Sequence, residues 1–113
     1  MRIAVSVLAI LFALLHILAA ATQFKSKDPA ARGLAVAMAS GGICAIAAAI
    51  VHLYWGAVGG NANLSDAATL AIGCLLICAS AYVNGRRSGN VHVSHHLIRV
   101  GIAVLLVLGF FLW

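Results

Sequence analysis

The chain has 113 residues, of which 65% are hydrophobic and only 8% are charged. A soluble domain carries about 25% charged residues, so this composition indicates a membrane protein. The net charge of +5 does not indicate a nucleic-acid partner, because the basic residues fall in short loops where they act as orientation signals. These loops leave no room for a soluble catalytic domain, and we expect neither enzyme activity nor a resident cofactor.

Residues 3–22 are predicted to form the first membrane span. The stretch from Ile3 to Ala21 is apolar apart from Ser6 and His16, and a bilayer core needs about 20 such residues. A cleaved signal peptide is the alternative, because Arg2 precedes the apolar run. The run is longer than the ~7–15 apolar residues of a typical signal peptide, which favours a retained span.

Residues 32–55 are predicted to form the second span, with Asp28 as the helix cap and Pro29 as the first helical residue. Small residues recur at every fourth position of this span: Gly33, Ala37, Gly41 and Ala45. Such a spacing lets a neighbouring helix approach closely. We therefore expect this face to be a helix-packing surface and the second span to lie at the centre of a bundle.

A turn rich in glycine and asparagine is predicted after Trp55, with Gly56 as the end of the second helix. The third span is predicted over residues 66–84. Asn63 or Ser65 can cap this helix by accepting a backbone N–H bond. Asp66 follows in the first turn of this helix, where the helix dipole favours a negative charge.

The third helix is predicted to end at Asn84–Gly85, and the last span covers residues 94–113. Asn90 is a candidate cap for a last helix that begins near Val91. The sequence therefore predicts an all-α membrane protein, a single domain of residues 1–113 folded as a four-transmembrane-helix bundle with short loops.

The orientation follows from the basic residues. Six of the seven lie on one side of the predicted spans, and only Arg2 lies on the other. The six are Lys25, Lys27, Arg32, Arg86, Arg87 and Arg99. Because positive loops stay in the cytoplasm, we expect loops 23–32 and 85–93 to be cytoplasmic and both termini to face out. The multi-pass protein is expected in a plasma (inner) membrane.

His16 and His52 are ionisable residues within predicted spans, so they are candidates for a transport or ligand site, together with Ser40 and Ser80. At about 1.5 Å per residue the two histidines differ by roughly 15 Å in depth, so one haem iron cannot bind both. The alternatives are an interfacial His52 beside the aromatic belt and a His16 that hydrogen-bonds a neighbouring helix.

His92, His95 and His96 form a cluster at the start of the last predicted helix. Imidazoles four residues apart can bind a transition metal, which makes the cluster a candidate metal site. No carboxylate or cysteine lies nearby in the sequence to complete the ligand set. The other interpretation is a weakly basic interface that contacts anionic lipid headgroups.

Cys44, Cys74 and Cys78 all fall near the predicted midplane of the membrane. Thiolates at this depth could bind a soft metal. A buried thiol in apolar surroundings is instead a small apolar residue, which is the simpler interpretation. The apolar parts of the predicted spans contain no Asp or Glu, so a carboxylate-coupled antiporter has no evident coupling group.

The functional prediction is a small integral membrane protein that acts by helix–helix association. It would be an accessory or assembly subunit, or a homo-oligomer, whose partners are the lipid bilayer and a membrane protein or a second copy. A small transporter or channel with His16 in its path is the first alternative. Metal or haem handling through histidines and cysteines is the second.

Overall fold

The computed structural model describes residues 1–60, 64–89 and 91–113. The helices are α1 (Arg2–Gln23), α2 (Pro29–Ala57), α3 (Leu64–Arg87) and α4 (Val93–Leu112). Each is long and apolar enough to cross a membrane, and no strand occurs among the described residues. The predicted all-α architecture with four spanning helices is confirmed.

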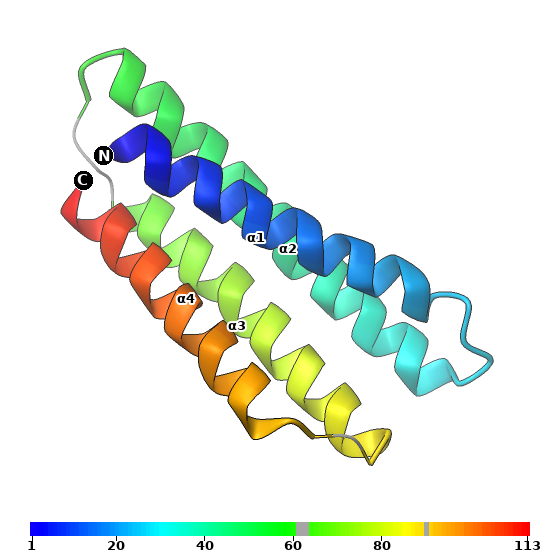
Figure 1. Ribbon diagram of the computed structural model, residues 1–113. Helices are drawn as coiled ribbons and strands as arrows, with labels where there is room; N and C mark the ends of the chain where they lie inside the picture. The colour runs from blue at the N-terminus through cyan, green and yellow to red at the C-terminus, as the bar shows by residue number, and fades with distance from the viewer. Residues whose placement is uncertain (61–63, 90) are drawn as a thin grey trace.

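The four helices form a ring in which each helix runs antiparallel to its two neighbours (Figure 1). In this ring α2 packs along α1 and α3, whereas α4 packs along α3 and α1. The second span is thus the helix with the most extensive packing, between α1 and α3, and it lies diagonal to α4. We call the end that holds both termini the terminal end, and the opposite end, with the α1–α2 and α3–α4 connections, the loop end.

The helices α1, α2 and α3 approach one another through small residues. A Cβ atom added to Gly41 would lie 2.6 Å from the carbonyl oxygen of Gly73, so the α2 and α3 backbones are in contact. One added to Gly42 would lie 2.6 Å from the Ile17 side chain of α1. Without glycine at position 41 the α2 and α3 backbones would have to separate, whereas at position 42 the Ile17 side chain would have to shift.

The small residues predicted from the sequence fall in different surroundings. Gly41 and Ala45 are buried against α3, and Ala37 is half-buried. Gly33 is exposed and has open space where a side chain would lie. The stripe thus contacts α3 only in the middle of α2, and Gly73 completes the contact from the other side.

The start of α2 is as the sequence indicates, but its end is not. The Asp28 carboxylate accepts a hydrogen bond from the Ala30 N–H at 3.0 Å, and Pro29 is the first helical residue. The helix continues through Gly56 to Ala57. Gly59, with φ +75°, supplies the left-handed turn that follows it.

The other two predicted boundaries also shift. Asn63 and Asn90, the predicted caps, lie outside the described residues. Ser65 is inside α3, where its hydroxyl donates to Asp66 at 3.3 Å rather than capping the helix. The C-terminal end of α3 lies one turn beyond its predicted site because the left-handed residue is Gly89, with φ +69°.

The last helix is held differently from the first three. It begins at Val93, later than predicted, and its buried residues are Ala103, Leu106 and Phe110. At the terminal end the Arg2 side chain donates hydrogen bonds to the backbone oxygens of Trp113, at 2.6 Å, and Gly60, at 2.9 Å.

Candidate polar sites at the two ends of the bundle

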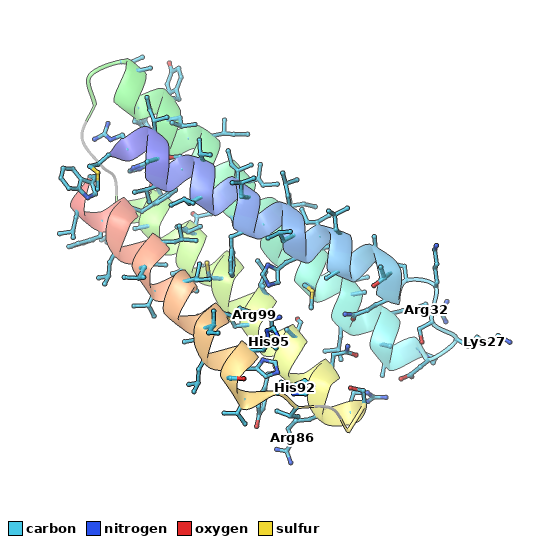
Figure 2. The ribbon with its side chains drawn as sticks, in the orientation of Figure 1. Lys27, Arg32, Arg86, His92, His95 and Arg99 are labelled. Atoms are coloured by element: carbon cyan, nitrogen blue, oxygen red, sulfur yellow. The ribbon has the colours of Figure 1, made fainter. Side chains whose placement is uncertain are left out.

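A polar pocket of about 380 Å³ opens between the helices at the loop end. We call it the histidine pocket, because four of the chain's five histidines line it. Figure 2 shows His92, His95 and Arg99 at the start of α4. The polar lining residues are His16 and Gln23 from α1, Asn84 from α3, Ser88 and His92 from the α3–α4 connection, and His95, His96 and Arg99 from α4.

His16 contributes to the pocket from the interior of α1. Its Nδ1 lies 2.7 Å from the carbonyl oxygen of Phe12, one turn earlier, and its ring packs on the Phe12 ring with the centroids 4.4 Å apart. Because a carbonyl oxygen only accepts, Nδ1 carries the proton in this contact. Nε2 is then the nitrogen that remains for a ligand or a proton.

Arg99 carries the fixed positive charge of the pocket. Its Nη1 lies 3.3 Å from Nδ1 of His96, and guanidinium can only donate, so His96 accepts this hydrogen bond. The His96 ring also packs against the Tyr82 ring of α3, with the two rings nearly perpendicular and their centroids 5.5 Å apart. Among the described residues, no carboxylate forms an ion pair with Arg99.

Asp28, an acidic residue at the loop end, is paired with an arginine outside the pocket. Asp28 forms an ion pair with Arg87 at 2.9 Å, on the surface beside the pocket. The Ala30 N–H bond, and after it the Arg87 contact, holds the pKa of Asp28 below the usual carboxyl value. Asp28 therefore stays charged and paired with Arg87, and the pocket keeps its positive character.

A second polar group lies inside the terminal end. His52 is 1% exposed and stacks on Phe110 of α4 with the ring centroids 4.2 Å apart. Its Nδ1 is 4.0 Å from a carboxylate oxygen of Asp66, which is also buried. Both nitrogens of His52 and this carboxylate oxygen have no hydrogen-bond partner.

Ser6 belongs to the same layer of the bundle. Its hydroxyl is fully buried and has no hydrogen-bond partner. The α1–α2 register, set by Arg2 against Gly56 and Ile17 against Gly42, brings Ser6 level with His52. Asp66, predicted only as a first-turn charge of the third helix, is therefore buried, and a Ser6, His52 and Asp66 layer occupies the terminal end.

Sequence reasoning missed this layer because hydropathy gives the depth of a residue but not the direction in which it faces. We expected His52 at the lipid interface beside Tyr54 and Trp55, which are exposed. The available signal was the distance along the chain: a short turn joins α2 to α3, so residues near its two ends must lie at the same depth. The short turn therefore places His52 and Asp66 in one layer.

His16 and His52 lie in different polar sites at opposite ends of the bundle, as their predicted depths require. Of the two serines predicted beside them, Ser80 is buried on α3, whereas Ser40 is exposed on the outside of α2. Ser40 therefore does not line either polar site. The four residues predicted for a transport or ligand site therefore do not line a single path through the bundle.

The predicted metal ligands are likewise dispersed. Cys74 and Cys78 line an apolar groove between α3 and α4, and Cys44 lies at the α2–α3 contact. The histidine cluster faces the pocket at the loop end. Among the described residues, no three His, Cys, Asp or Glu side chains come together as a metal ion would need.

Comparison of the chain with protein families, with curated proteins and with solved structures finds no match. The class of the protein is therefore defined by its fold alone. Four apolar helices of membrane-spanning length, joined by short connections, make it a small multi-pass membrane protein.

Proposed function

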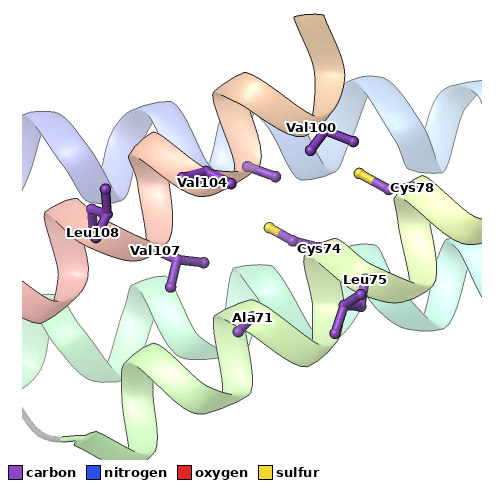
Figure 3. Close-up of a pocket in the computed structure, with 9 residues that line it drawn as sticks. Ala71, Cys74, Leu75, Cys78, Val100, Val104, Val107 and Leu108 are labelled. Atoms are coloured by element: carbon purple, nitrogen blue, oxygen red, sulfur yellow. The ribbon is translucent and has the colours of Figure 1, made fainter. Parts of the chain in front are cut away.

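We propose that the protein works by association with another transmembrane helix, as an accessory or assembly subunit or as a homo-oligomer. The observation that carries this proposal is the open groove between α3 and α4, of about 310 Å³. Figure 3 shows the residues that line it. They are Ala71, Cys74, Leu75, Cys78, Val100, Ala103, Val104, Val107 and Leu108.

The chemistry of this groove suits a helix. Its lining is apolar, with small residues such as Ala71 and Ala103 between larger ones such as Leu75 and Val104. In a bilayer there is no water to drive helices together, so association depends on close packing, and small residues allow a partner to come near. A partner helix seated here would also cover the outward face of α4.

Membrane placement forms part of the proposal. The excess of lysine and arginine at the loop end favours loops 23–32 and 85–93 in the cytoplasm and both termini outside, in a plasma (inner) membrane. The protein would have lipid and a membrane protein, or a second copy of itself, as partners and would bind no nucleic acid. It would carry out no catalysis.

The test is the native mass of the gently solubilised protein, measured on two matched variants. Leu75→Trp fills the groove, whereas Ile72→Trp adds the same bulk on another exposed face of α3. We expect the wild type and Ile72→Trp to be recovered in a complex of fixed stoichiometry and Leu75→Trp to be recovered as a single chain. Wild-type protein that is a single chain throughout would contradict the proposal.

A carrier is the second candidate, and the histidine pocket is the observation that favours it. His16 reaches this pocket from within α1, where a translocated proton or ion could meet it. A carrier predicts that His16→Ala abolishes flux into vesicles while the native mass is unchanged. An accessory subunit predicts that the complex and its activity tolerate this substitution.

A further inference from the structure

Two hollows lie along the seam between α1 and α4. The first is the histidine pocket at the loop end. The second is an apolar groove of about 420 Å³, which we call the α1–α4 groove. It is lined by Val5, Leu8, Leu11, Phe12 and Leu15 from α1 and by Ile102, Leu105 and Leu106 from α4.

The two hollows adjoin one another along both helices. On α1, the ring of Phe12 in the groove contacts the ring of His16 in the pocket. On α4, Arg99 of the pocket precedes Ile102 of the groove by one turn. A molecule that spans them meets cationic and hydrogen-bonding groups at one end and only hydrocarbon beyond.

The pocket has the composition of an anion site. Arg99 has no ion-pair partner among the described residues, and none of the pocket-lining residues is acidic. The side-chain oxygen of Gln23 is buried there without a hydrogen-bond partner. Since the oxygen and nitrogen of an amide are assigned from their neighbours, the opposite orientation would offer a donor to an anion. Arginine and imidazole N–H groups bind phosphate oxygens by charge-assisted hydrogen bonds.

We propose that this seam binds an anionic phospholipid. The phosphate would be held by Arg99 with the histidines at the start of α4, and one acyl chain would lie in the loop-end half of the α1–α4 groove. Leu11 lies about 18 Å along α1 from the loop end, and the hydrocarbon of one leaflet is about 15 Å deep. Basic pockets between transmembrane helices are known lipid-headgroup sites.

The experiment counts lipids bound to the folded protein by native mass spectrometry after release from nanodiscs. The discs contain phosphatidic acid or phosphatidylcholine with identical acyl chains. We expect one phosphatidic acid per chain and no retained phosphatidylcholine. The Arg99→Gln variant should bind phosphatidic acid about tenfold more weakly, as the loss of a charged hydrogen bond implies.

Arg32→Gln is the matched control, because Arg32 is an exposed arginine at the same end that does not line the pocket. His96→Gln provides a second pocket variant that keeps the charge of Arg99, and it should also weaken binding. Equal loss in the Arg32 and Arg99 variants, or equal retention of phosphatidylcholine, would overturn the proposal. Glycerol phosphate that binds as tightly as the lipid would also overturn it, because the groove would then contribute nothing.

Discussion

The helices α2 and α4 contact their neighbours through different kinds of residue, and the two helices pack differently as a result. Between α2 and α3 the backbones meet at Gly41 and Gly73. Most of α4 carries valine, leucine and phenylalanine, and two apolar grooves flank it. Because lipid tails are as apolar as these side chains, bulk alone does not draw α4 into the bundle. Small residues therefore hold α1, α2 and α3 together, and we call these three helices the scaffold. The fourth helix, α4, lines both apolar grooves.

The largest loss of stability is expected for Gly41→Leu. The new side chain has to displace the backbone of α3, and overpacking of this kind costs up to about 3 kcal/mol. Gly33→Leu is the control, because the space around Gly33 is open. The free energy of unfolding in mixed micelles measures both variants. Similar losses at the two positions would contradict the packing described for α2 and α3.

A smaller loss is expected for Asp66→Leu, which leaves His52 buried beside an apolar group. Because His52 is already without a hydrogen-bond partner, the variant loses only the contact at 4.0 Å, and we expect a loss of about 1 kcal/mol. The double variant His52→Phe, Asp66→Leu removes both polar groups. It should regain the lost stability, because replacing both partners of a buried pair is often neutral. A double variant less stable than Asp66→Leu would show that the layer stabilises the fold.

The fourth helix should respond more weakly to the same kind of change. A Cβ atom added to Gly109 would lie 2.7 Å from the Val5 side chain, and a side chain can rotate where a backbone cannot. We expect Gly109→Ala to cost about 1 kcal/mol, the low end for overpacking. The same unfolding assay compares it with Gly41→Ala, which should cost more. The reverse order would remove the distinction between scaffold and α4.

The smallest effect is expected at the surface pair of Asp28 and Arg87. Asparagine caps a helix about as well as aspartate, so Asp28→Asn removes only the charge. Folding lowers the pKa of Asp28, so its stabilisation is present above the unfolded value of 3.8 and is lost as the pH falls through the folded value. The melting temperatures of wild type and Asp28→Asn should therefore differ slightly at neutral pH and converge in strong acid. A difference that persists there would contradict this assignment.

The sequence predicts the helices well because apolar length and charge depend only on the local chain. The cap at Asp28 and Pro29 is also local, and it is found where predicted. The helix ends at Gly56 and Gly85 were misjudged because several glycines lie close together in each turn. Only the backbone conformation distinguishes the left-handed Gly59 and Gly89 from the others.

The polar sites could be predicted only in part, because they depend on how the helices are turned about their axes. The sequence placed His16 and His52 at different depths, and they do lie in separate sites. It did not indicate that Asp66 turns inward or that Ser40 turns outward. These directions follow from the contacts at Gly41, Gly42 and Gly73, which join residues far apart in the chain.

The most direct test of the central claim compares two spin-label distances by pulsed electron paramagnetic resonance, with the native cysteines replaced by alanine. One pair of labels, at Val36 and Val83, joins the exposed faces of α2 and α3, and the other, at Leu18 and Leu97, joins those of α1 and α4. In micelles without anionic lipid or partner, we expect a narrow distance distribution for the first pair and a broader one for the second. Equally narrow distributions would show that α4 is held as firmly as the scaffold and would contradict this expectation.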